Sequence, residues 1–296
     1  MAPNPDASLK ALEDRVGHPQ QKWEALQAHI QDDAIRRFAD VETDWLDLMW
    51  TLDAYRIKGL PPRGMPGPAN SQARLAAIYR GKGNWFAAML SLLLENQTTQ
   101  RIAPRVRVSG FSQTHQIDVA WPARKADPLV CAETKVTGAP PYGSTRARGA
   151  MSDWTNRRKE LKFAATDLKL YRRQQETRIE HWDVWRQSAF PRMYFLWAAR
   201  LRPGDRIEKM IAEAQALVHT YLEGAGIFAW RDKNDRYVPV PLPPQARIST
   251  LDDVLYRIAS EVKELSPGGH IPPPVVPSNR VIEAETLEDD ASNGGH

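Results

Sequence analysis

A strongly apolar run at residues 129–136 carries two charges, Glu133 and Lys135, and this combination limits what the chain can fold into. Leu, Val, Cys and Ala fill most of the run, which predicts a strand in the interior of a sheet. Residues two apart on a strand share a face, so the carboxylate and the ammonium stand side by side. Charges on an interior strand are costly to bury, and they therefore indicate a functional site. The alternative is a surface pair on an edge strand, which contributes little to stability.

A second strand-like run, residues 116–121, places Asp118 fifteen residues before Glu133. Two such strands, joined by a loop at residues 122–128, are predicted to pair antiparallel and to bring the two carboxylates together. Adjacent carboxylates bind a hard divalent cation, and a neighbouring lysine can stabilise a developing oxyanion. The three charged residues therefore predict a metal-dependent phosphodiesterase. The alternative for Asp118 is a carboxylate that faces water or pairs with a basic neighbour.

The arrangement resembles the PD-(D/E)XK nuclease superfamily, which includes most type II restriction endonucleases. In that family an Asp lies on one strand, and (D/E)-x-K follows on the next strand after a variable loop. Here Asp118, Glu133 and Lys135 match those positions, while Ile117 stands where the family motif has proline. The resemblance covers roughly residues 83–202.

The predicted order of elements is also that of the family core. It consists of a helix at residues 84–95 with Asn84 as its N-cap, a strand at 105–108, the strands with Asp118 and Glu133, a helix at 154–175 and a strand at 192–198. The predicted fold is therefore α/β, a restriction-endonuclease-like mixed β-sheet core flanked by helices, with an N-terminal helical region.

Glu95 ends the first of these helices, where many members of the family carry an extra metal-site glutamate. A carboxylate at this end opposes the helix dipole, so a bound cation would compensate it; the alternative is a residue that marks the exit into solvent. The resemblance implies that Asp118, Glu133, Glu95 and the backbone carbonyl of Thr134 hold one or two Mg²⁺ ions, with Mn²⁺ as a substitute. It further implies that Lys135 orients the attacking water or neutralises charge in the transition state, and that the product carries a 5′-phosphate.

Basic residues concentrate after the Glu133 strand, with fourteen Lys/Arg against six Asp/Glu in residues 142–202. Such an excess predicts a polyanionic partner in this part of the chain. The residues expected to contact a nucleic-acid backbone are Arg146 and Arg148 in a loop at 142–149, and Arg158, Lys162, Lys169 and Arg173 in a stripe along the helix at 154–175. The alternatives are a plain connecting loop and a solvated helix face.

The predicted domains are an N-terminal helical region (1–58), a Pro/Gly-rich linker (59–72), a catalytic domain (73–265) and a disordered acidic tail (266–296). The N-terminal region carries several tryptophans and leucines, so it is expected to pack on the core or on a second subunit, which leaves a homodimer open. Neither a run of about 20 apolar residues nor a signal peptide is present, and the chain has a single cysteine. A cytoplasmic protein without a membrane partner is expected.

The sequence thus predicts a Mg²⁺-dependent DNA endonuclease that acts on double-stranded DNA in restriction or anti-phage defence. No phosphate-binding loop or dinucleotide fingerprint is present, so no nucleotide cofactor is expected. Three alternatives stay open. They are a nuclease of the same fold that acts on RNA or on single-stranded or branched DNA, a non-catalytic nucleic-acid-binding module, and a helical interaction protein whose N-terminal region is the active part.

Overall fold

The structure is a computed structural model that describes residues 5–65, 67–122, 128–143, 145–177, 188–244 and 249–266. Its helices are α1 (Pro5–Val16), α2 (Pro19–Asp32), the short 3₁₀ helix η1 (Phe38–Asp40), α3 (Glu42–Lys58), α4 (Ser71–Arg80), α5 (Lys82–Thr98), α6 (Trp154–Thr177), α7 (Ile207–Gln215) and α8 (Leu251–Leu265). Its strands are β1 (Ala103–Ser109), β2 (Thr114–Trp121), β3 (Val130–Thr137), β4 (Arg192–Arg200), β5 (Gly224–Lys233), β6 (Arg236–Val240) and β7 (Ser249–Thr250). The predicted acidic tail beyond residue 266 and most of the predicted 122–128 loop lie outside the described residues.

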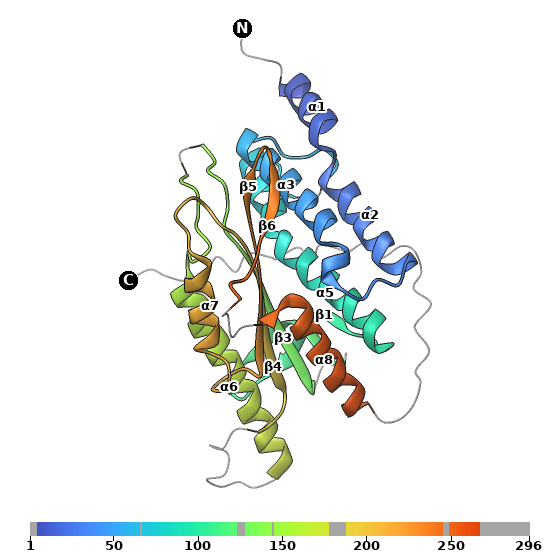
Figure 1. Ribbon diagram of the computed structural model, residues 1–296, viewed down its shortest axis with the longest axis vertical. Coiled ribbons are helices and arrows are strands. Elements are labelled where there is room, and N and C mark those ends of the chain that lie inside the picture. The colour runs from blue at the N-terminus through green and yellow to red at the C-terminus, as the bar shows by residue number, and fades with distance from the viewer. Residues whose placement is uncertain are drawn as a thin grey trace.

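A seven-stranded mixed sheet forms the centre of the molecule (Figure 1). Strands β1 to β6 lie in chain order, and β7 pairs with β5. The pairs β1–β2, β2–β3 and β5–β6 are antiparallel, whereas β3–β4, β4–β5 and β5–β7 are parallel. The predicted α/β class, the order helix, three strands, helix, strand, and the antiparallel pairing of β2 with β3 are confirmed.

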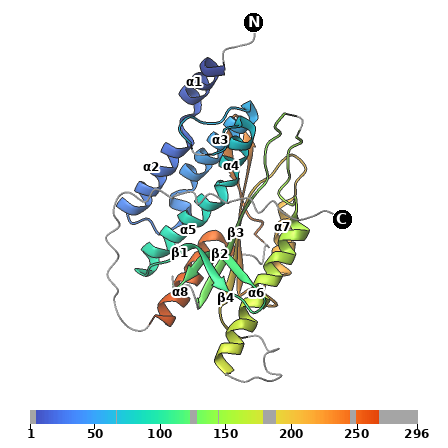
Figure 2. The same cartoon turned by 180° about the vertical axis from the view of Figure 1, so that it is seen from behind.

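Helices cover both faces of this sheet (Figures 1 and 2). Helices α6 and α7 pack on one face, and α2, α3, α5 and α8 pack on the other. Strand β4 is buried along almost its whole length, as expected for a parallel strand covered on both sides. None of the helices in the described ranges has the length and apolarity needed to span a bilayer.

The N-terminal helices share the main hydrophobic core with the sheet. Trp23 stacks on Trp85 of α5 at a centroid distance of 5.7 Å, and Trp45 contacts Phe86 at 5.2 Å. All four rings are buried. Of the two predicted alternatives, the structure thus shows the apolar load of this region packed on the core of the same chain.

One predicted boundary differs from the structure. Helix α5 begins at Lys82 with Gly81 as its N-cap, so Asn84 lies inside the helix. Helix α7 ends at Gln215, and the chain turns shortly after it, with a φ of +69° at His219. The proline-containing stretch after Arg236 forms β6, where Pro239 is tolerated because β6 is an edge strand.

Candidate active site

The regular alternation of β2 breaks at Asp118. Ile117 and Ala120 both belong to the apolar cluster under α6, whereas Val119 belongs to the cluster on the opposite face. Side chains of an undistorted strand would alternate from one residue to the next. Asp118 therefore lies at a local distortion of the strand.

The ladder between β2 and β3 ends at the same point. Its paired residues run from Trp121 and Val130 to Val119 and Ala132, so the next position would bring Asp118 opposite Glu133. There the strands part, and the Thr134 backbone N–H bonds to the Asp118 side chain instead of to the backbone of β2. This opening explains how two charged side chains fit between otherwise buried strands.

The three predicted catalytic residues meet at this opening. The Thr134 backbone N–H and hydroxyl donate to Asp118 Oδ2, with donor–acceptor distances of 2.8 and 3.1 Å. Lys135 Nζ donates to Glu133 Oε2 at 3.3 Å and lies 3.8 Å from Asp118 Oδ2. The side chains of Asp118, Glu133 and Lys135 retain 21%, 11% and 25% of their exposure. The cluster is thus partly buried, and solvent still reaches all three side chains.

Burial and neighbouring charge set the protonation of this cluster. The pKa of Glu133 is raised to about 7: burial is the largest cause, the Asp118 and Glu160 carboxylates add to it, and Lys135 opposes them. Burial works to lower the pKa of Lys135, but the Glu133 and Asp118 carboxylates outweigh it and raise that pKa. Lys135 therefore keeps its charge, while the paired carboxylates carry an excess of negative charge that a cation would relieve.

This donor set fits Mg²⁺, which is commonly bound by one or two protein carboxylates together with waters and substrate phosphates. Asp118 and Glu133 would supply the two carboxylates. The predicted coordination by the carbonyl oxygen of Thr134 stays a prediction, since the contacts of Thr134 to Asp118 involve its N–H and hydroxyl.

Glu95 does not join this pair. It lies on α5, which packs on the sheet face opposite α6, and its Oε1 accepts a hydrogen bond from the backbone N–H of Ile102 at 3.0 Å. Within the described ranges, no three histidine, cysteine or acidic side chains come together as a metal site. The structure therefore gives no support to Glu95 as a third ligand.

Two charged residues of α6, Arg157 and Glu160, act electrostatically on the cluster. Glu160 contributes to the raised pKa of Glu133, and Arg157 works to lower the pKa of Lys135, so both lie within electrostatic reach. Arg157 also donates to Glu160 at 2.8 Å. The sequence missed Arg157 because it lies outside the predicted basic stripe.

The predicted basic stripe on α6 is not presented to solvent as four free cations. Arg158 pairs with Glu213 at 3.1 Å, Lys162 lies 4.8 Å from the ring centroid of Tyr221, and Lys169 pairs with Glu223 at 2.7 Å. Lys169 is buried, and Arg173 is partly buried with contacts of its own. The stripe faces α7 and the segment before β5, which bring their own acidic and aromatic side chains.

Both arginines of the predicted basic loop at 142–149, Arg146 and Arg148, are exposed. Arg148 forms an ion pair with Asp153, and Ser144 lies outside the described residues. Of the six predicted backbone-binding residues, Arg146 is thus the most available for a phosphate.

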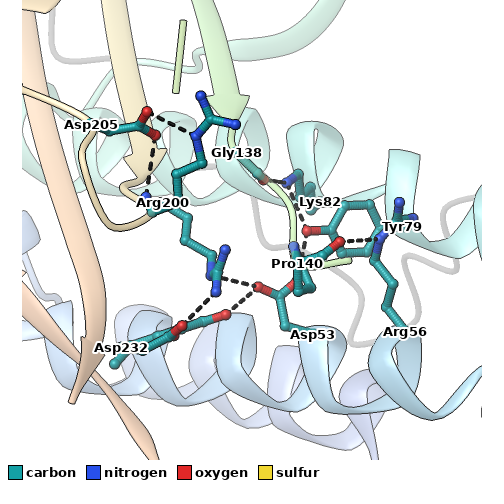
Figure 3. Close-up of polar contacts among 11 residues, drawn as sticks. Asp53, Arg56, Tyr79, Lys82, Gly138, Pro140, Arg200, Asp205 and Asp232 are labelled. Atoms are coloured by element: carbon teal, nitrogen blue, oxygen red, sulfur yellow. Dashed lines mark hydrogen bonds and ion pairs between the residues drawn. The ribbon is translucent and has the colours of Figure 1, made fainter. Parts of the chain in front are cut away.

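A second polar cluster, centred on the buried Asp53 of α3, was not found from the sequence (Figure 3). Its carboxylate accepts hydrogen bonds from the hydroxyls of Tyr79, at 2.6 Å, and Tyr237, and lies 3.7 Å from Arg200 Nε. Lys82 Nζ donates to the Tyr79 hydroxyl at 3.2 Å and to the carbonyl of Gly138, just beyond β3, at 2.9 Å. The cluster therefore joins α3, α4 and α5 to the end of the strand that carries Glu133 and Lys135.

Burial dominates the chemistry of this second cluster. It raises the pKa of Asp53 despite the nearby cations, and it lowers the pKa of Lys82 to about 8. The Asp53 carboxylate, the two tyrosine hydroxyls and Lys82 bond to one another in the interior, so the cluster acts as a structural tie between the N-terminal helices and the sheet.

A third group ties the β1–β2 hairpin to α6. The buried Asp167 contacts His115 Nε2 at 2.7 Å and accepts from the Ser112 hydroxyl at 2.7 Å. Since Ser112 bonds to the carboxylate and not to the imidazole, the group lacks the serine–histidine contact of an activated nucleophile. His115 lies in β2.

Comparison of this chain with protein-family models, with curated proteins and with solved structures finds no match.

Proposed function

We propose that this protein is a Mg²⁺-dependent phosphodiesterase that cuts DNA within the strand, with a restriction-endonuclease-like core. The observation that carries the proposal is the meeting of Asp118, Glu133 and Lys135 in one half-buried cluster where β2 and β3 part. The order of elements around it supports the fold assignment. The resemblance to nucleases of this type further suggests double-stranded DNA as the substrate and restriction or anti-phage defence as the role.

The chain's own residues have separate tasks in this proposal. Asp118 and Glu133 would hold the Mg²⁺, which supplies Lewis-acid polarisation and a water of lowered pKa. Thr134 keeps Asp118 oriented through two hydrogen bonds to the same carboxylate oxygen. Lys135 places a fixed positive charge beside the phosphoryl oxygens, where negative charge develops in the transition state.

A cleavage assay with a panel of substrates tests the proposal. The full chain is incubated with double-stranded DNA, single-stranded DNA and RNA, each with Mg²⁺ or with EDTA. We expect Mg²⁺-dependent cleavage of double-stranded DNA that Asp118→Asn and Glu133→Gln abolish. Glu95→Gln is the matched control, because its carboxylate bonds to the Ile102 backbone away from the pair, and it should keep activity.

The same panel separates the alternatives. Cleavage of RNA alone would mean that the substrate is RNA and not DNA. Retention of each nucleic acid without cleavage would indicate a binding module. Cleavage that survives in Asp118→Asn would contradict the assignment of the site.

A further inference from the structure

Arg105 on β1 has a backbone conformation that residues with a Cβ rarely adopt inside a strand. Its φ is +54°, in the left-handed region, which costs energy for any residue other than glycine. The other non-glycine residues with positive φ in the described ranges lie at turns, bends or helix ends; they are Ala34, Thr99, Asp153, His219, Asn234 and Asp235. Arg105 has no such local explanation.

The strained residue lies directly across from the candidate active site. In the β1–β2 register Pro104 pairs with Val119 and Val106 pairs with Ile117, so Arg105 stands opposite Asp118 and both are skipped. Neighbouring strands lie about 4.8 Å apart, which puts Arg105 one strand away from Asp118 on β2 and two strands away from Glu133 on β3. The distortion of β1 thus coincides with the distortion of β2 at Asp118.

The charge of Arg105 is uncompensated within the described part of the chain. Its side chain is exposed and takes part in none of the ion pairs found there. With the Gln116 amide oriented to satisfy both partners, the amide oxygen accepts from Nη2 at 3.1 Å and from Nε at 3.3 Å. Four cations of β3, of α6 and of the segment before α6 are already paired: Lys135 with Glu133, Arg148 with Asp153, Arg157 with Glu160 and Arg158 with Glu213.

We propose that Arg105 binds the DNA phosphate next to the one that is cut. The inference rests on the proposed function and adds the residue that fixes the register of the strand in the site. Strained backbone conformations cluster at functional sites, where the strain holds a required side chain in position. Gln116 holds the guanidinium from one side and leaves Nη1 for a phosphate oxygen, a planar geometry that suits arginine.

DNA binding in EDTA and single-turnover cleavage in Mg²⁺ test this role. Arg105→Asn tolerates a left-handed φ but removes the charge. We expect it to weaken binding about 10- to 100-fold and to reduce the slope of log affinity against log salt by about 0.9, as for one lost phosphate contact. Arg107→Asn is the matched control on the same strand, and we expect its affinity and slope to match those of the wild type.

Thermal unfolding tests the strain itself. Arg107 has no positive φ, so Arg107→Gly should lower the Tm by about 1–4 °C. Arg105→Gly should keep or raise the Tm, because glycine relieves the left-handed conformation, yet it should lose DNA affinity as Arg105→Asn does. A residue retained only for packing would lose stability and affinity together.

The outcomes separate this inference from the function on which it rests. If the wild type cuts DNA and Arg105→Asn binds and cuts it equally well, with an unchanged salt slope, then Arg105 does not bind a phosphate. That result would overturn the role of Arg105 and leave the proposed function standing. A wild-type chain that neither binds nor cuts any DNA would overturn the proposed function, and the role of Arg105 with it.

Discussion

Replacing Asp53 by alanine should be among the most destabilising single changes in this chain. The carboxylate is buried in the interior and receives two tyrosine hydroxyls, with the Arg200 guanidinium beside it. Through Tyr79 it also holds Lys82 against the end of β3. Alanine would remove the contacts of the carboxylate with Tyr79, Tyr237 and Arg200 at once.

The expected cost follows from what the substitution leaves behind. Two hydroxyls would lose their acceptor, at about 1–3 kcal/mol for each group that stays unsatisfied. The buried cations Lys82 and Arg200 would lose their shared counter-charge, and breaking a buried ion pair from one side costs about 3–5 kcal/mol. These terms overlap, and burial already penalises the ionised Asp53, so we expect a loss of about 4 kcal/mol in the free energy of unfolding.

Urea unfolding followed by tryptophan fluorescence measures this loss. Asp232→Ala is the matched control, because Asp232 also pairs with Arg200 but its side chain is 48% exposed, and we expect a cost below about 1 kcal/mol. Equal effects of the two substitutions, or a loss below about 1 kcal/mol for Asp53→Ala, would refute the buried tie. The wild type should unfold in one transition, because the N-terminal helices and the sheet share one core.

Three further predictions concern groups whose surroundings the structure defines. The pKa of Glu133 is raised from 4.5 to about 7, so between these pH values the folded state binds more protons than the unfolded state, and stability falls as the pH rises. In urea unfolding, Glu133→Gln should therefore be more stable than the wild type by about 2–3 kcal/mol at pH 8 and equally stable near pH 4. Lys169→Ala should lower the free energy of unfolding by about 2–3 kcal/mol, because Glu223 loses its ion-pair partner. The slope of log DNA affinity against log salt should stay unchanged, and a reduced slope would show that Lys169 contacts DNA. Cys131 is buried and burial raises its pKa, so a thiol reagent should modify it only at the rate of unfolding, and rapid labelling of the native chain would contradict its placement.

The candidate site was largely predictable because its signal is local. The charges of Glu133 and Lys135 interrupt an apolar strand, and the spacing to Asp118 predicts an antiparallel neighbour. What periodicity does not give is the bend of β2 at Asp118, which arises from the way β1, β2 and β3 pack together.

The residues that sequence reasoning misplaced depend on distant partners. The helical pattern separates the face of α6 that carries Lys169 from its apolar face. It does not reveal that Lys169 bonds to Glu223, which lies 54 residues further along the chain. Glu95 was assigned by its place at a helix end, and nothing local tells which face of the sheet that helix covers. Asp53 reads as an ordinary helical acid, because its tyrosine and arginine partners come from α4, β4 and β6.

Calorimetric titration of the full chain with Mn²⁺, in buffers of different ionisation enthalpy, tests the metal pair most directly. With a pKa of about 7, Glu133 is roughly half protonated at pH 7, so binding should release about half a proton per metal ion. Asp118→Asn and Glu133→Gln should each abolish binding and proton release, whereas Glu95→Gln should retain both. Unchanged binding in the two pair variants, or no binding by the wild type, would contradict a metal site between β2 and β3.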